Sequence, residues 1–238
     1  MQVLPIKTRV FLEGENLLEF ILEHVKKVQE NSVLVVTSKI VALSEVRTAK
    51  IKNQKDLARL IKKESDFAVE TEFVWLTIKD GLIMPSAGID ESNANGKVIL
   101  LPKDSFLAAQ KIRVALKLKF KLKNFGVVIS DSRILPGRAG VVGIALGYAG
   151  FKGIRNYIGK KDIFGRVFKY SRTDIADCLA TSAVLCMGEG NERQPLAVIE
   201  NPPATFTSTV NKKELYININ EDIYKPFFQS LKKVRFKK

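Results

Sequence analysis

Apolar positions along the chain follow two different periods, which predict helices and strands in alternation. Helical spacing marks residues 15–30, where Leu17, Leu18, Ile21, Leu22 and Val25 share one face. The same spacing predicts helices over 54–64, 103–117 and 172–190. An Asp/Ser cap begins the helix over 103–117, and Gly188 and Gly190 end the helix over 172–190.

Alternating or continuous β-branched runs predict strands at 3–12, 32–38, 125–132 and 195–200. Lys79-Asp80-Gly81 predicts a hairpin turn, and 117–123 fits either a strand or a helix end. The pattern indicates an α+β fold with mixed helices and strands. We expect one unit over residues 1–238, because no linker marks a domain boundary.

Charge changes this picture only modestly. The 238 residues contain 39 Lys+Arg and 25 Asp+Glu, for a net charge of +14, which favours anionic partners such as nucleic acid or phosphorylated small molecules. A lysine-rich composition explains the charge equally well. No RRM, KH, helix-turn-helix or zinc pattern is present, so we expect no nucleic-acid partner. The basic stretch from Lys225 onward is interpreted as a solvated tail.

Several classes of chemistry and location are excluded by simple counts. Cys178 and Cys186 lie eight positions apart, too far for a disulfide within one helix, and are expected to be reduced core residues. The only histidine, His24, sits in a predicted amphipathic helix, which argues against a zinc site or a Ser-His-Asp mechanism. The apolar run 139–151 is too short to span a bilayer. We therefore expect a cytoplasmic protein with no membrane partner.

Three carboxylates stand in small, polar turns at the ends of apolar elements. Asp90 lies in "SAGIDESN" (86–93), Asp131 follows the strand in "ISDSR", and Glu189 lies between Gly188 and Gly190. Each alone fits a cap or a solvated turn as well as a ligand. Together they fit a site for a hard divalent cation and a nucleotide.

Glycines concentrate in the segment 137–153, which holds six of the 15 in the chain. Neither a Rossmann motif nor a P-loop matches their spacing. Glycine at this density allows close approach of backbone to backbone or of backbone to ligand. The sequence leaves these two explanations open, with close strand packing favoured.

The motifs resemble those of the coenzyme F-420-0:L-glutamate ligases (CofE), the deazaflavin γ-glutamyl ligases. The resemblance runs from "VLPIKT" to about Glu200, and its most specific pieces follow each other in the family's order: "VVTSKIV", "SAGIDESN", "VILLPKD", "GVVISDS", "GRAGVVGIALGYAG", "IGKKDIFGR" and "ADCLATSAVLCMGEG". It implies a CofE-like fold with largely antiparallel sheets in an intertwined homodimer. It also implies the addition of L-glutamate to an acceptor carboxylate, with GTP and divalent metal, through an acyl phosphate.

The resemblance also implies roles for individual residues. Two Mg²⁺ or Mn²⁺ ions, with K⁺ as a further candidate, would be held by Asp90, Asp131, Ser132 and Glu189. Catalytic roles fall to Asp131 and Arg138. The nucleotide would contact residues in four segments, namely Arg9, Val10, Phe11, Leu12, Ser38, Lys39, Asn93, Met187, Gly188, Gly190 and Asn191.

Two departures from the family pattern indicate a divergent member. Leu43 stands where the family has a phosphate-contacting lysine, and Lys39 is a candidate substitute. Ile134-Leu135 replaces a Gly-Arg pair that follows the metal-binding aspartate, and Arg133 is new. Three hypotheses remain: a ligase for coenzyme F-420-0 or a related acceptor, a folate γ-glutamyl ligase, and a non-catalytic paralogue that binds a nucleotide or another anionic metabolite.

Overall fold

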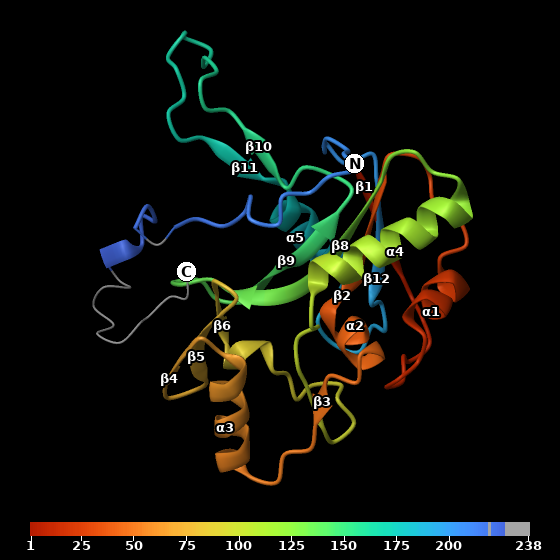
Figure 1. Cartoon of the computed structure of the whole chain (residues 1–238), viewed down its shortest axis with the longest axis vertical. Coiled ribbons are helices and arrows are strands. Elements are labelled where there is room, and N and C mark those ends of the chain that lie inside the picture. Colours follow the sequence, from red (N-terminus) through yellow and green to blue (C-terminus); the bar gives the residue numbers. More distant parts are fainter. Residues whose placement is uncertain (219, 227–238) are drawn as a thin grey trace.

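A five-stranded sheet forms the centre of the protein (Figure 1). The computed structural model describes residues 1–218 and 220–226. Only the β2–β8 pair in this sheet is parallel, and the other neighbours are antiparallel, so the predicted α+β class with mostly antiparallel sheets is confirmed. The strands lie in the order β1 (Gln2–Ile6), β12 (Leu196–Glu200), β2 (Ser32–Thr37), β8 (Phe125–Ile134) and β9 (Val141–Ala149).

Helices cover both faces of this sheet. One face packs against α1 (Leu17–His24), α2 (Ser38–Ser44) and α4 (Ser105–Phe120), and the other packs against α5 (Ile175–Met187). Successive β2 side chains alternate between the two layers: Leu34 lies in the α1/α4 core, whereas Val33 and Val35 lie in the α5 core. Burial on both faces explains why this strand is a continuous apolar run in the sequence.

A smaller group of elements lies below the main sheet in the view of Figure 1 and contacts α2 and β8. It contains a three-stranded antiparallel meander, in which Asp80 and Gly81 (φ 51° and 79°) make the predicted hairpin turn. Its elements are β3 (Thr48–Ala49), α3 (Gln54–Glu64), β4 (Phe67–Glu70), β5 (Trp75–Lys79), β6 (Leu82–Pro85), the 3₁₀ turn Ser86–Gly88 and β7 (Val98–Ile99).

A long hairpin projects away from the body of the molecule (Figure 1). Its base is formed by β10 (Ile154–Asn156) and β11 (Arg172–Asp174), which pair antiparallel. Ile163 and Phe164, in the connection between the two strands, are 91% and 90% exposed. We call residues 157–171 the arm.

Several sequence predictions need correction. The first strand ends at Ile6 rather than continuing to residue 12, the first helix ends at His24, and the ambiguous stretch 117–123 continues α4 to Phe120. The helix predicted over 172–190 spans 175–187, because residues 172–174 form β11 and Asp174 caps the helix. Cys178 and Cys186 are free, as expected, but exposed rather than in the core.

The glycine-rich segment forms β9, and two of its glycines allow helices to pack closely on the strand. A Cβ at Gly143 would lie 2.5 Å from the Ala180 carbonyl oxygen of α5. A Cβ at Gly147 would lie 2.5 Å from the Phe106 backbone nitrogen of α4. The close packing at these two glycines is between strand and helix, whereas Gly150, just after β9, approaches a neighbouring strand, because a Cβ there would lie 2.2 Å from the Phe125 carbonyl oxygen of β8.

Two further expectations concern membranes and the basic tail. Within residues 1–218 and 220–226, none of the helices has the length and apolar character needed to cross a bilayer. The basic stretch begins at Lys225, and its part from residue 227 onward, which was expected to be a solvated tail, lies outside the described residues.

Candidate active site

The site begins where the two parallel strands end at the same edge of the sheet. Register pairs Thr37 of β2 with Ser130 of β8, so the next residues, Ser38 and Asp131, are neighbours although they lie 93 positions apart in the sequence. The Ser38 hydroxyl donates a hydrogen bond of 3.0 Å to Asp131 Oδ1. A bulge between Ile129 and Ser130 changes the register of β8 against β9 immediately before the aspartate.

Asp131 is the most electrostatically perturbed carboxylate of this site. Burial raises its pKa to about 6, against the opposing effects of hydrogen bonds from Ser38 and the Ser132 backbone and of the Lys39 charge. Repulsion from Asp90 adds to the rise. A carboxylate in this setting is stabilised by any further positive charge that enters the site.

Asp90 faces the same space from a separate loop. Lys39 Nζ lies 2.7 Å from Asp90 Oδ2 and donates a 2.8 Å hydrogen bond to Ser92 Oγ, while the Ser92 backbone N–H donates to Asp90 Oδ1 at 2.7 Å. Backbone hydrogen bonds with Ile99 hold Asp90 in place. Although burial acts to raise the pKa of Asp90, the bonds from Lys39 and Ser92 outweigh it and hold that pKa below its ordinary value.

The third carboxylate approaches from the end of α5. Ser132 Oγ donates a 2.5 Å hydrogen bond to Glu189 Oε1, which connects β8 to the turn after α5. Gly188 caps the helix with φ 81°, a conformation that favours glycine. Asn93 Nδ2 lies 3.5 Å from the Gly190 carbonyl oxygen, so the Asp90 loop also contacts this turn.

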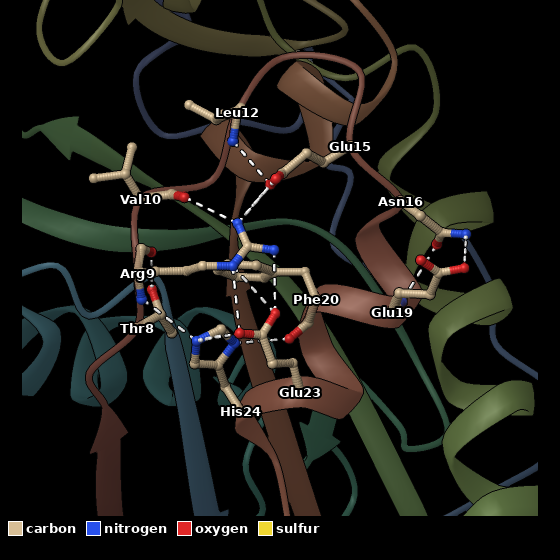
Figure 2. Close-up of polar contacts among 10 residues, drawn as sticks. All are labelled: Thr8, Arg9, Val10, Leu12, Glu15, Asn16, Glu19, Phe20, Glu23 and His24. Atoms are coloured by element: carbon tan, nitrogen blue, oxygen red, sulfur yellow. Dashed lines mark hydrogen bonds and ion pairs between the residues drawn. The ribbon is translucent and has the colours of Figure 1, made fainter.

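The segment 9–12 borders the same turn, since the Thr8 backbone N–H donates to the Arg193 carbonyl at 2.9 Å. Figure 2 shows the Arg9 guanidinium between Glu15 and Glu23, above the Phe20 ring. The ion pairs measure 2.9 Å to Glu15 and 3.1 Å to Glu23. Arg9 is therefore already neutralised by two carboxylates, and a nucleotide phosphate would have to compete with them.

His24 supports this arrangement, as Figure 2 also shows. Its Nδ1 lies 2.9 Å from the Phe20 carbonyl oxygen, and its Nε2 accepts a long, 3.4 Å hydrogen bond from the Arg9 backbone N–H. The histidine thus holds a backbone turn and lies outside the carboxylate cluster.

Some predicted site residues present only their backbone to this region. The side chains of Phe11 and Met187 belong to the two cores, with 6% and 5% exposure. Val10 and Leu12 are instead well exposed. Of the adjacent residues, Gly190 donates its N–H to Glu192, and Asn191 is exposed.

Two other predicted positions lie apart from the carboxylates. Arg138 is exposed in the β8–β9 turn, beyond the end of β8 at Ile134, which is about 10 Å along the strand from Asp131. Leu43, which the motif resemblance sets against a lysine, is partly buried and packs against the core. The structure therefore does not bring Arg138 to Asp131, and it gives residue 43 a packing role.

Sequence reasoning missed two residues of this region. Ser92 bonds both Lys39 and Asp90, and its short spacing from Asp90 is typical of a turn in which the side-chain carboxylate accepts a backbone N–H. Arg133 has a buried Nε without a hydrogen-bond partner among the described residues, and its charge acts to lower the pKa of Asp177 in α5. The sequence shows Arg133 only as a departure from the family pattern.

Comparison with known proteins identifies the family. Residues 5–201 match the model of the F420-0:Gamma-glutamyl ligase family. The coenzyme F420:L-glutamate ligase of Methanococcus maripaludis strain S2 is 34% identical over 205 residues, which cover 84% of this chain and 81% of the relative. The enzyme of the same name from Archaeoglobus fulgidus is 30% identical over 242 residues, covering 94% and 96%.

These matches place the chain in the class of amide-forming ligases. More particularly, the chain belongs to the F420-0:gamma-glutamyl ligase family. The family resemblance drawn from the sequence motifs is therefore confirmed.

The donors at the site suit one kind of cation. Among the described residues, no group of three or more His, Cys, Asp or Glu side chains is close enough to hold a metal by itself. Asp90 and Asp131 repel each other, the Ser38 hydroxyl donates to Asp131, and the Ser92 backbone N–H donates to Asp90. Mg²⁺ commonly takes one or two carboxylates and completes its coordination with water and substrate phosphates. The residues present therefore fit a metal that arrives with a nucleotide.

Proposed function

We propose that this protein is a GTP- and divalent-metal-dependent γ-glutamyl ligase that adds L-glutamate to a carboxylate of coenzyme F-420-0 or a related acceptor. The observation that carries the proposal is the half-buried Asp131, whose pKa is raised by desolvation, held by Ser38 and facing Asp90, in a chain of this family. Carboxylate oxygens are the protein ligands that a nucleotide-bound Mg²⁺ or Mn²⁺ prefers, and this preference supports the proposal.

The reaction class explains the need for a nucleotide. A carboxylate is a poor electrophile, so an oxygen of the acceptor attacks the γ-phosphorus of GTP, and GDP leaves. The glutamate amine then attacks the acyl carbon, inorganic phosphate leaves, and the amine loses its proton. Asp90 and Asp131 would hold one metal ion, with Ser132 and Glu189 as candidate ligands of a second, and these ions would neutralise charge at the phosphates. We include K⁺ only as a candidate further cation.

This chain's own residues position the reacting groups. Ser38 fixes one oxygen of Asp131, and Ser132 bonds Glu189, so neighbouring β8 residues anchor two parts of the site. Lys39 places an ammonium between the Asp90 loop and Asp131. From there it can bond a phosphate oxygen, which supports its role as the substitute for the family lysine replaced by Leu43.

The acceptor distinguishes two versions of the proposal. Coenzyme F-420-0 is favoured by the names of the relatives from Methanococcus maripaludis and Archaeoglobus fulgidus. A reduced folate is the alternative acceptor, and both acceptors suit the net charge of +14 because both are anionic.

Mass spectrometry of the reaction mixture tests the proposal directly. Purified protein, L-glutamate, GTP or ATP, and Mg²⁺ or Mn²⁺ are incubated with each acceptor separately. A mass gain of one glutamyl residue that needs nucleotide and metal supports the ligase, and the acceptor that gains it selects the version. An absence of product with both acceptors, in protein that still binds GTP, supports the non-catalytic paralogue.

The non-catalytic alternative rests on a specific observation. Leu43 packs into the core where the family carries a phosphate contact, and Ile134-Leu135 replaces the Gly-Arg pair with two exposed apolar side chains. Loss of both features removes positive charge from the acceptor and phosphate environment. Lys39 and Arg133 are the residues whose presence argues for retained activity.

We also propose a homodimer, in which the arm contacts a second copy of the chain. Ile163 and Phe164 are about nine-tenths exposed on a hairpin that projects from the body (Figure 1). Apolar side chains presented this way gain stability when a partner removes them from water. Sedimentation at micromolar concentration tests the dimer, and a stable monomer would contradict it.

A further inference from the structure

A cleft lies between the base of the long hairpin and the segment that follows the main sheet. Its volume is about 640 Å³, within the range of sites for small ligands. One wall carries Lys152, Ile154, Asn156 and Arg172. The other is formed by 207–214, beyond the residues 5–201 matched by the family model.

The hairpin wall presents two cations and an amide in one direction. Asn156 and Arg172 are directly opposite each other in the β10–β11 register, so their side chains lie on the same face. Lys152 is anchored nearby, because its backbone N–H donates to the Thr205 carbonyl at 2.9 Å. Within the described part of the chain, neither the Lys152 ammonium nor the Arg172 guanidinium has an ion-pair or hydrogen-bond partner.

The amides of the cleft are also biased towards donating. Asn156 Oδ1 accepts the Ile158 backbone N–H at 2.9 Å, and Asn211 Oδ1 accepts the Lys213 N–H at 3.0 Å. Both acceptor oxygens are thus occupied, while both amide NH₂ groups are left to donate. Two cations and two amide donors line one cleft.

The one carboxylate among the lining residues, Glu214, does not offset the excess of cations and hydrogen-bond donors in the cleft. Glu214 Oε1 accepts hydrogen bonds from the Tyr148 hydroxyl at 2.5 Å and from the Gly153 N–H at 2.7 Å. It is thereby held against the floor of the cleft, where it ties the segment 207–214 to the hairpin base. Ile154 and Val210 add apolar surface on opposite walls.

We propose that this cleft is a second binding site, for a small organic anion that carries at least two carboxylate or phosphate groups. Paired cations and donor amides match the several acceptor oxygens of such a ligand, and the apolar walls accommodate its carbon skeleton. None of the residues that line the cleft belongs to the candidate active site, and the proposal does not depend on the ligase reaction.

Calorimetry with the full chain in EDTA tests the site, since chelation removes metal-dependent binding elsewhere. Citrate and pyrophosphate serve as carboxylate and phosphate probes, with glycerol as the uncharged control. We expect one equivalent of at least one anionic probe to bind. The double variant Lys152→Ala/Arg172→Ala should weaken it about tenfold or more, because two charge-assisted contacts are lost.

A matched control separates a built site from general charge attraction. Arg166→Ala/Lys169→Ala likewise removes one arginine and one lysine, but from the arm, and should leave the affinity for the anion unchanged. Hydrogen exchange should show probe-dependent protection at 152–156 and 205–214. The proposal is overturned if neither anion binds at millimolar concentration, if both double variants lose affinity equally, or if protection appears only at 88–93 and 187–194. The probe that binds more tightly identifies the ligand as a carboxylate or a phosphate compound.

Discussion

Replacing Asp131 by asparagine should raise the stability of the folded protein at neutral pH and abolish its metal-dependent activity. Burial raises the pKa of this carboxyl from 3.8 to about 6, so the folded protein binds its proton more tightly than the unfolded chain does. The folded state therefore loses stability as the pH rises through this range, because the ionised carboxylate must remain buried. Asparagine keeps an oxygen to accept the Ser38 hydrogen bond but carries no charge.

The magnitude follows from the difference between the two pKa values. The shift from 3.8 to about 6 corresponds to at most about 3 kcal/mol once the carboxyl is fully ionised, at about 1.4 kcal/mol per pKa unit. Part of this cost is already present at about pH 4.5, so the stability advantage of Asp131→Asn over the wild type should grow by about 2 kcal/mol between pH 4.5 and 7.5.

Urea unfolding followed by circular dichroism, with EDTA present at both pH values, measures this difference. The same variant should lose metal-dependent glutamyl transfer, because an amide is a poorer ligand for Mg²⁺ than a carboxylate. A stability difference that does not change with pH would refute the buried-charge argument. Turnover at the wild-type rate would remove Asp131 from the catalytic site.

Three further predictions concern other parts of the molecule. Lys39→Met should lower kcat/KM for GTP by about 10²-fold or more, because the ammonium that we propose as a phosphate contact is lost. Lys97→Met removes an ion pair with Glu13 and should leave kcat/KM unchanged; equal kinetics in both variants would dismiss Lys39 as the phosphate contact. Ile163→Ser/Phe164→Ser should convert the proposed dimer to monomers in sedimentation while leaving the unfolding midpoint of the monomer unchanged, and a dimer that persists in this variant would place the interface elsewhere. Gly150→Ala should lower the free energy of unfolding by about 2–4 kcal/mol, because a Cβ there would lie 2.2 Å from the Phe125 carbonyl oxygen and the residue has φ +95°. Gly137→Ala, with open space around it, should lower it by only about 1 kcal/mol in urea unfolding. Similar losses in both variants would show that the positive φ, rather than crowding by Phe125, determines the cost.

The sequence predicts elements well where one strong local signal dominates. The β2 strand is a continuous β-branched run, and α3 has clear helical spacing, so both match the structure. In contrast, the sequence pattern does not reveal α2, because "SKIVALS" is only seven residues long and follows the β2 run without a break. The glycines of β9 hide that strand, since glycine has low β propensity and is tolerated here through close packing against α4 and α5.

The carboxylates of the candidate site could be selected by residue type and position, but their partners could not. Asp90, Asp131 and Glu189 all stand at ends of apolar elements, which is visible in the sequence. The Ser38–Asp131 contact depends on a parallel strand pairing across 93 positions, and no local pattern encodes it. The pairing of Arg9 with Glu15 and Glu23 likewise follows from how the chain turns before α1.

The position of β12 has a consequence for how the chain assembles during synthesis. This strand lies between β1 and β2, so the first strand of the protein contacts the sheet only through one of the last. While the ribosome is still making residues 7–195, the β1 segment has no partner strand, and the edge of β2 that β12 will cover remains open. Closing so long a loop is slow, and exposed strand edges favour pairing with other chains. The main sheet is therefore completed only after synthesis has passed Glu200.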